Sequence, residues 1–218
     1  MTIHKEGKGT ILTVWLIAFS VLGLSIAFIS NLFILCPIAA ICIFFICFIL
    51  FFFRVPERTT VEGTNVVTSV ADGEVVIVDK VTDSEYFKGE CIQVSVYMSF
   101  FNVHVNYWPI DGEVTYYKYH PGRYMLAFLP KASELNEHSS MAIRSKHGDV
   151  FFKQLAGTFA RRIVTYAPIG AFKVKGSQCG IIKFGSRIDM YLPLGTDIKV
   201  KVGDKVKACE SVIAELRK

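Results

Sequence analysis

A glycine–serine pair close to the C-terminus is the first feature of this chain that could do chemistry. Gly185-Ser186 lies in the segment Lys183–Asp189, where glycine interrupts a β-type pattern. The electrophile next to the serine hydroxyl is the carbonyl of Gly185, on its own N-terminal side. If Ser186 attacks that carbonyl, the chain cuts itself, and the new N-terminus can become a cofactor. A β-turn is the competing interpretation of the same pair.

A histidine in an apolar segment is the candidate base for such a serine. A free hydroxyl is a weak nucleophile at neutral pH, and a carboxylate behind the base fixes the tautomer of the base. His104 lies in Phe100–Pro109, among apolar and aromatic residues, where a buried imidazole needs a partner. A satisfied core histidine is the alternative. No two of the five histidines have metal-ligand spacing, so we expect no metal site.

A short internal repeat predicts two similar turns. Ala71-Asp72-Gly73-Glu74-Val75 recurs as Ile110-Asp111-Gly112-Glu113-Val114. Aspartate-glycine before a β-branched run predicts a hairpin turn, in which glycine supplies a positive φ and aspartate caps its own backbone.

The N-terminal quarter of the chain predicts a membrane anchor. Residues 11–53 contain no charged side chain, and as one helix they would be about 64 Å long against a hydrocarbon core of about 30 Å. We therefore expect two spans, Thr10–Ile29 and Leu32–Phe53, with the break at Ser30-Asn31. A signal peptide is less consistent with this length and with the second apolar segment. One span plus an interfacial helix is the main alternative.

Charge predicts the side of the membrane and excludes one class of partner. Lys5 and Lys8 precede the hairpin, Arg54 and Arg58 follow it, and its turn is uncharged. The positive-inside rule then places the rest of the chain on the cytoplasmic face of the cell membrane. Its net charge of +4 from residue 54 onward suits anionic lipid. The cations are not interleaved with an aromatic platform, so we expect no nucleic-acid binding.

The remainder, residues 54–218, is predicted to be mainly β. Short runs of period two, separated by glycine and proline-glycine breaks, indicate an antiparallel sandwich or half-barrel. Only Pro130–Arg144 has the pattern of a loop plus a short helix. The segment Val200–Ala214 resembles the half-repeat of lipoyl and biotinyl carrier domains, although it offers no modifiable lysine at a hairpin tip. The six cysteines form no C-x-x-C pair, which fits a reducing compartment.

Several segments together resemble the phosphatidylserine decarboxylase family, especially its short, two-span class. They occur in family order and cover nearly all of residues 55–218. The matching stretches are Ser69–Gly73, Phe101–Asn106 with Pro109–Gly112, His120–Gly122, Lys131–Ser133 with Asn136-Glu137, Gln154–Gly157 with Ala160–Ile163, and Lys183–Arg187.

The resemblance implies a self-processing, pyruvoyl-dependent carboxy-lyase. Ser186, helped by His104 and Asp72, would cleave the chain after Gly185 into a 1–185 beta chain and a 186–218 alpha chain that stay associated. Residue 186 would become a covalent pyruvoyl cofactor that forms a Schiff base with phosphatidylserine, releases carbon dioxide and leaves phosphatidylethanolamine. His104 is the candidate that protonates the resulting carbanion. A homo-oligomer is left open.

Departures from the longer class of the family limit what can be carried over. Phe101 stands where that class has a second histidine, and His138 stands where the family often has arginine. Arg161, Arg162 and Arg187 are candidate anion partners or solvated surface residues. Two other functions stay open. One is a decarboxylase of a related seryl phospholipid, and the other is a non-enzymatic, membrane-anchored lipoyl-like adaptor or carrier.

Overall fold

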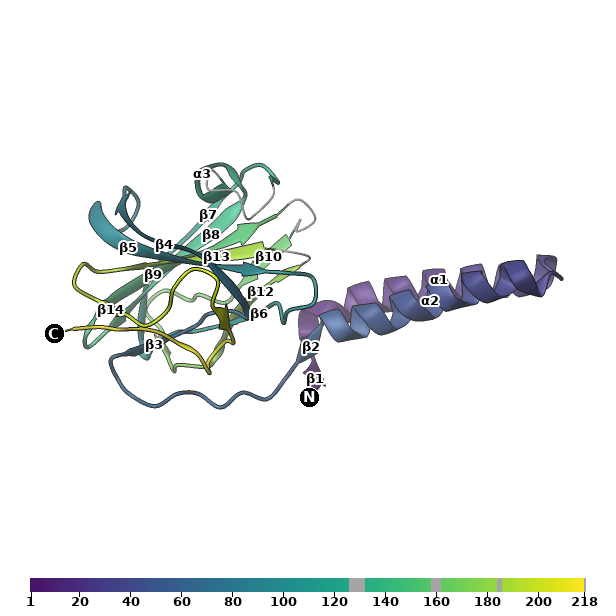
Figure 1. Cartoon of the computed structure of the whole chain (residues 1–218), viewed down its shortest axis with the longest axis horizontal. Helices are drawn as coiled ribbons and strands as arrows, with labels where there is room; N and C mark the ends of the chain where they lie inside the picture. The colour runs from purple at the N-terminus through teal and green to yellow at the C-terminus, as the bar shows by residue number, and fades with distance from the viewer. Residues whose placement is uncertain (126–131, 158–161, 184–185, 218) are drawn as a thin grey trace. The chain divides into compact units, whose positions relative to one another are not determined.

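The computed structural model describes the chain except for residues 126–131, 158–161, 184–185 and 218, and except for the side chains of residues 132 and 134. The described residues divide into two compact units, Met1–Glu57 and Arg58–Lys218. The sequence-based boundary falls four residues earlier, after residue 53. Figure 1 shows the elements of each unit.

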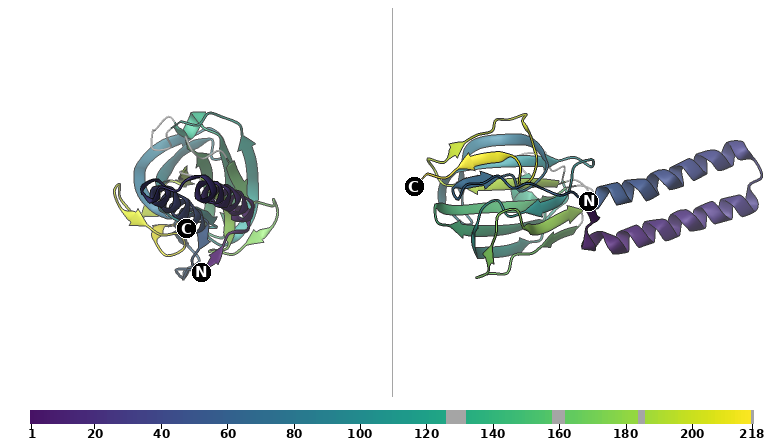
Figure 2. Two further views of the ribbon diagram at one scale, coloured as in Figure 1. Left: turned by 90° about the vertical axis from the view of Figure 1, so that its right-hand side faces the viewer. Right: turned by 90° about the horizontal axis from the view of Figure 1, so that it is seen from below.

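The first unit is a helical hairpin, and its two helices run side by side in Figure 2. Its elements are β1 (Thr2–Ile3), the 3-10 helix η1 (Lys5–Gly7), α1 (Lys8–Phe28), α2 (Leu32–Phe52) and β2 (Arg54–Val55), and β1 pairs with β2. Asn31 lies at the expected break and caps α2, because its Oδ1 accepts the Phe33 N–H at 2.9 Å.

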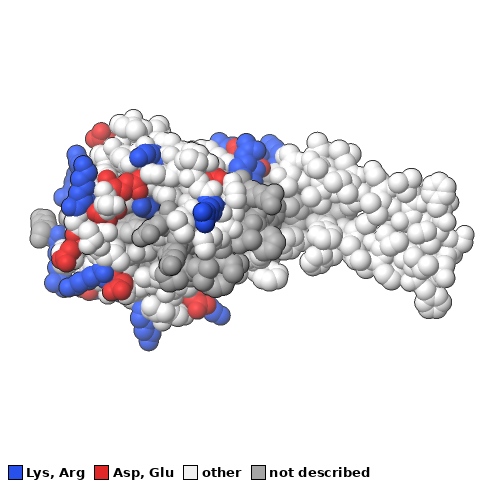
Figure 3. Space-filling model, turned by 90° about the horizontal axis from the view of Figure 1, so that it is seen from above, with Lys and Arg blue, Asp and Glu red and all other residues white. Residues whose placement is uncertain are grey.

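Both helices are long and apolar enough to cross a membrane. Lys8, the first residue of α1, is the one charged residue of the two helices, and most of the hairpin surface is uncharged in the view of Figure 3, whereas the second unit carries charges of both signs. The two-helix hairpin predicted from the sequence is therefore present, with bounds within two residues of the expected spans. His4, in the segment before α1, is buried, and its Nδ1 accepts the Glu6 N–H.

The second unit is built on a curled, eight-stranded antiparallel sheet (Figure 1) in the order β11-β7-β8-β9-β13-β5-β4-β15. Its strands are β4 (Gly73–Asp83), β5 (Gly89–Met98), β7 (Gly112–His120), β8 (His138–Ser145), β9 (Gly148–Ala156), β11 (Phe172–Lys173), β13 (Ser186–Leu192) and β15 (Lys205–Val206). Two three-stranded sheets complete the unit: β10 (Arg162–Thr165), β12 (Gln178–Lys183) and β6 (Val105–Tyr107), and β14 (Asp197–Ile198), β16 (Val212–Glu215) and β3 (Val66–Thr68). The mainly β half-barrel predicted from period-two patterning is confirmed.

The loop-plus-helix expected over Pro130–Arg144 is only partly present. Helix α3 (Ala132–Leu135) has four residues, and β8 begins at His138. The first six residues of β8 are all buried, because the strand pairs with β7 on one side and β9 on the other. Pairing on both sides thus decides the conformation of this segment, and its local pattern does not.

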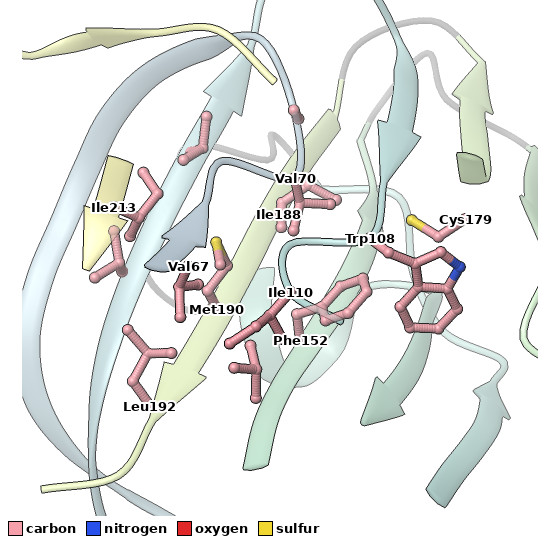
Figure 4. Close-up of a cluster of buried hydrophobic side chains, with 14 of the residues drawn as sticks. Val67, Val70, Trp108, Ile110, Phe152, Cys179, Ile188, Met190, Leu192 and Ile213 are labelled. Atoms are coloured by element: carbon pink, nitrogen blue, oxygen red, sulfur yellow. The ribbon is translucent and has the colours of Figure 1, made fainter. Parts of the chain in front are cut away.

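The main core lies on one face of the large sheet. Along β13 the side chains of Ile188, Met190 and Leu192 point into it, as Figure 4 shows, and Phe152 of β9 packs beside them. The intervening β13 residues Arg187, Asp189 and Tyr191 point to the opposite face, because successive strand residues alternate. On that face Tyr191 packs in a second, smaller cluster with Phe151 of β9.

The sequence repeat is a structural repeat. Asp72 Oδ1 accepts the Ala208 N–H at 2.9 Å, and Asp111 Oδ1 accepts the Lys175 N–H at 2.7 Å. Neighbouring backbone bonds repeat as well: Cys209 N–H donates to Ser69 O, Gly176 N–H to Trp108 O, Gly203 N–H to Val75 O, and Gly170 N–H to Val114 O. Each aspartate therefore fastens a distant segment onto the start of a strand.

The two glycines of this repeat serve a different purpose from the one the sequence suggested. Neither Gly73 nor Gly112 has a positive φ, so the expected hairpin-turn role is wrong. A Cβ at Gly73 would lie 2.2 Å from the Tyr97 carbonyl oxygen, and a Cβ at Gly112 would lie 2.2 Å from that of Arg144. Glycine is required because the neighbouring strand approaches so closely.

Candidate active site

Ser186 is the first residue of a central strand. It pairs with Met98 of β5 and Ala156 of β9, its exposed fraction is 0%, and it shares the core face with Ile188. Its hydroxyl donates to Met98 Sδ at 3.8 Å. A thioether is a weak acceptor, so the hydroxyl loses little when it exchanges this contact for a stronger acceptor. The expected cleavage partner, Gly185, lies outside the described residues.

His104 is fully buried, immediately before β6. Its Nδ1 lies 3.0 Å from the Asn102 carbonyl oxygen. Because a carbonyl can only accept, Nδ1 carries the hydrogen, and Nε2 of the neutral ring is left with a lone pair. The His104 carbonyl accepts the Ile182 N–H at 3.3 Å. Ile182 lies four residues before Ser186, so His104 lies beside the segment that leads to the serine.

Both carboxylate oxygens of Asp72 contact other groups of this chain. Oδ2 forms an ion pair with Arg58 Nη2 at 2.6 Å, and Oδ1 accepts the Ala208 N–H. The sequence suggested that Asp72 acts behind His104, but among the described contacts Nδ1 of His104 faces the Asn102 carbonyl. The role of Asp72 therefore stays a prediction.

A cavity of about 510 Å³ nevertheless relates Asp72 to the segment before His104. It is lined by Asp72, Ser99 and Asn102, together with Gly73, Glu74, Tyr97, Lys205, Val206 and Lys207. Asn102 Oδ1 accepts both the N–H and the hydroxyl of Ser99, at 2.9 and 2.7 Å, and so fixes the turn whose carbonyl orients His104. Asp72 and this turn thus share one hollow at the Ser186 end of the sheet.

Three polar residues beside Ser186, namely Gln154, Asn106 and Thr165, were not predicted as site residues. Gln154 and Asn106 nevertheless belong to the sequence stretches that resemble the family. Gln154 Nε2 donates to Asn106 Oδ1 at 2.7 Å, and Thr165 Oγ1 donates to Gln154 Oε1 at 2.7 Å. Asn106 Nδ2 also donates to Met98 Sδ, the atom that Ser186 contacts. These side chains form an uncharged hydrogen-bonding network beside Ser186, and the Met98 thioether is shared between Asn106 and the serine hydroxyl.

A second cluster joins Glu85, His120 and His138, whose candidate ligand atoms lie within 4.8 Å of one another. The sequence predicted no metal site, and this cluster arises only from tertiary contacts. Lys153 Nζ lies 2.7 Å from Glu85 Oε2, and the two imidazole rings stack at 4.3 Å with planes 15° apart. Parallel rings do not aim their lone pairs at one point, and the lysine already neutralises the carboxylate. The geometry favours an ion-pair cluster.

Burial and charge shift the pKa values in this cluster. Burial alone would raise the pKa of Glu85, but Lys153 and His120 lower it to about 2. Burial lowers the pKa of His138, whose Nδ1 lies 2.7 Å from the Asn136 carbonyl oxygen. At neutral pH Glu85 is therefore a carboxylate and His138 a neutral ring.

The arginines expected as candidate anion partners differ in position. Arg187 has an exposed fraction of 0% and is ion-paired with Asp189, whereas Arg162 is exposed on β10. Arg161 lies outside the described residues. Arg187 is thus neither a solvated surface residue nor an open anion site.

Comparison with known proteins identifies the family. The sequence profile described as "Phosphatidylserine decarboxylase" matches residues 45–214. A Parabacteroides distasonis protein named phosphatidylserine decarboxylase proenzyme is 39% identical over the whole of both chains. Proteins of the same name from Amoebophilus asiaticus and Nitrosomonas europaea are 46% and 47% identical over 77% of this chain and over 75% and 78% of their own. The chain belongs to the phosphatidylserine decarboxylase family.

Membership of this family confirms the resemblance that the ordered motifs indicated. It favours the decarboxylase over the adaptor or carrier alternative. In this phosphatidylserine decarboxylase family member, Ser186 and Asp72 lie at one end of the curled sheet, because the β13, β5 and β4 register aligns Ser186 with Met98 and Glu74 with Tyr97. His104 adjoins this end through Asn102, whose carbonyl it contacts and which lines the same hollow as Asp72.

Proposed function

We propose that this chain is a self-cleaving proenzyme that decarboxylates phosphatidylserine to phosphatidylethanolamine. Family membership supports the reaction class. The observation that carries the residue assignment is the position of Ser186: it is buried at the start of β13, its hydroxyl contacts a weak acceptor, and His104 lies beside the segment before it.

Self-cleavage begins when the Ser186 Oγ bonds to the carbonyl carbon of Gly185. The hydroxyl proton passes to Nε2 of His104 and then to the departing amide nitrogen, so the peptide bond between 185 and 186 becomes an ester. Removal of the α-proton of residue 186 then breaks its Cβ–O bond and releases chain 1–185 with a C-terminal carboxylate. Water replaces the nitrogen of residue 186, which leaves as ammonia, and a pyruvoyl group remains.

This group supplies a carbonyl that bonds to the substrate's amine and accepts the electron pair left when carbon dioxide departs. The chain's own residues bind and orient. Asn106 and Gln154 provide the neutral amide surroundings described above, and His104, with its hydrogen on Nδ1, offers Nε2 as the atom that exchanges a proton with the reacting carbon. Asp72 is the proposed carboxylate of this set.

Lipid substrate and membrane anchor agree with each other. Two helices that could cross a membrane precede the catalytic unit, so a phospholipid headgroup needs to reach only the interface. The charges flanking these helices support a cytoplasmic catalytic unit at the cell membrane, in contact with anionic lipid. The proposal leaves a homo-oligomer open. Its alternative is a decarboxylase of a related seryl phospholipid, whose headgroup chemistry is the same.

Replacing Ser186 by alanine tests the proposal directly. Without Oγ no ester can form, so S186A should remain one chain of 24.4 kDa and lack decarboxylase activity, while still fractionating with membranes. Intact mass of the purified protein is the measurement, and S177A, which removes an exposed hydroxyl that donates to Val174 O, is the control. A wild-type chain that stays intact, or decarboxylation by S186A, would refute the assignment.

A further inference from the structure

The residue that follows Ser186 is held by a buried ion pair. Arg187 and Asp189 lie two apart on β13, on the face opposite the main core, and both are 0% exposed. Arg187 Nη2 donates to Asp189 Oδ2 at 3.0 Å, and Nε lies 2.8 Å from Oδ1. The pair thus combines one hydrogen bond through Nη2 with a close charge contact at Nε, and charge-assisted contacts of this kind are stronger than neutral ones.

Neighbouring elements tie this pair in place. Ser133 of α3 donates to Asp189 Oδ2 at 2.8 Å and also accepts from Arg187 Nη2. Ser95, directly opposite on β5, donates to Asp189 Oδ1 at 2.6 Å, and Gln93 donates to the Ser95 hydroxyl at 2.9 Å. The pair is thus linked to one neighbouring strand and to the short helix, and it cannot shift without breaking several buried hydrogen bonds.

If the proposed function is correct, residue 186 needs to be held in position after cleavage. Once the bond between 185 and 186 is broken, residue 186 keeps one covalent attachment, the amide to the nitrogen of Arg187. The end of a strand frays unless contacts hold it. The carbonyl of the pyruvoyl group must nevertheless stay in a fixed position for the substrate's amine, because small displacements of reacting groups cost large factors in rate.

We propose that Arg187, Asp189 and Ser133 form a clamp that positions residue 186 after cleavage. The clamp acts through the Arg187 amide and does not touch the substrate, so these are positioning residues. This inference rests on the proposed function and deepens it. It predicts that maturation and turnover respond differently to the same substitution, because the uncut chain is held at both ends and the cut chain at one.

Two variants test the clamp in the full chain, in detergent or proteoliposomes. Ser133→Ala removes the partly buried hydroxyl that contacts both Arg187 and Asp189. Arg187→Lys keeps the positive charge but loses the planar guanidinium group. We expect both to be cleaved at close to the wild-type rate. The turnover number should fall about 3- to 10-fold in S133A and about 10- to 100-fold in R187K, with the Michaelis constant nearly unchanged.

A readout independent of turnover is the denaturant concentration that releases the 33-residue chain, which should be lower in both variants. The matched controls are S177A and R144K, the latter from the Arg144–Asp149 pair at 3.2 Å, whose arginine side chain is 62% exposed. Both controls should match wild type in cleavage, turnover and chain release.

Three outcomes would overturn the clamp. They are wild-type turnover and chain release in cleaved S133A and R187K, loss of cleavage in parallel with turnover, and equal effects in the controls. If R187K does not accumulate, S133A alone decides. A wild-type chain that is never cleaved would instead refute the proposed function, so the two failures are distinguishable.

Discussion

Asp72 and Asp111 occupy equivalent positions of the repeat and share one structural role, and Asp72 has a second contact of its own. Both aspartates accept a backbone N–H from a distant segment, at Ala208 and Lys175. Asp72 additionally pairs with Arg58, and both side chains of this pair are nearly buried. The hydrogen bond that both aspartates make connects a distant segment to each copy of the repeat. The ion pair is made only by Asp72, at the end of the sheet that carries Ser186.

Asparagine at each position separates these two roles. The amide oxygen of Asn still accepts the backbone N–H, so D72N and D111N should both keep the repeat fastened. D72N also removes one charge opposite Arg58, which keeps Glu210 at 3.4 Å, so the loss of stability should be smaller than the about 3–5 kcal/mol of a buried charge left with no partner. We expect D72N to slow self-cleavage by at least about 10-fold, the low end for loss of a catalytic group, and D111N to cleave normally, as measured by intact mass over time. Equal rates would remove Asp72 from the catalytic set.

His104 carries the prediction about proton transfer. Because its Nδ1 hydrogen is directed at Asn102, Nε2 is the basic atom, and its loss should slow cleavage by about 10²- to 10⁴-fold. H104A is therefore expected to accumulate as uncut chain and to regain cleavage when imidazole is added. His147, which contacts Thr64 on the surface, supplies the control H147A. Normal processing of H104A would exclude the base role.

At the scale of elements, the turn of the β4–β5 hairpin packs against the face of the large sheet that is opposite the main core. Asp83 Oδ2 accepts the N–H groups of Tyr86 and Phe87, each at 2.7 Å, and closes the turn. The Tyr86 ring stacks on Phe151 of β9 at 5.2 Å. Glu85 then reaches His120 and Lys153, so one short hairpin links β7 and β9.

This fastening should be sensitive to acid. The folded pKa of Glu85 is about 2 against an ordinary 4.5, so its contribution is present above about pH 4.5 and is lost as the pH falls toward 2. The pKa of His138 is lowered from 6.5, so the unfolded chain binds its proton first and stability also declines below pH 6.5.

The variant E85Q tests the acid dependence. It should be destabilised by about 1–3 kcal/mol at pH 7, because Lys153 loses its buried partner, and it should lose less further stability between pH 4.5 and 2 than wild type. Unfolding midpoints at several pH values give the comparison, with exposed Glu90, as E90Q, for control. A wild-type pH profile in E85Q would contradict the assignment.

For the whole molecule, the sheet order predicts the fate of the two chains. Residues 186–218 would contribute β13, which pairs with β5 over seven residues and with β9 over six, together with β14, β15 and β16. A strand bonded on both sides in the middle of a sheet cannot leave without exposing core residues such as Ile188 and Met190.

The cleaved chains should therefore co-elute in mild detergent and separate only under denaturing conditions. Size-exclusion chromatography followed by intact mass of the peak provides the measurement. Recovery of the large chain alone, still folded, would show that β13 does not hold the two chains together.

Much of this protein could be predicted from local sequence. The uncharged run of residues 11–53 exceeds the thickness of one bilayer core, so its length alone requires a break, which the structure has at Asn31. Period-two patterning predicts the strands, because side chains alternate across a sheet with one buried face. The ordered motifs around His104 and Ser186 also predicted the family before any tertiary contact was known.

Tertiary structure alone decided which partners the buried polar groups have. Asp72 meets Ala208, 136 residues away, and Arg58, 14 away, while Glu85 meets His120 and Lys153 from other strands. Strand register fixes these contacts, and a slip of one residue would turn every side chain of a strand to the opposite face. The glycine–serine pair is therefore visible in the sequence, whereas the buried pair that follows it on β13 depends on where three distant segments meet.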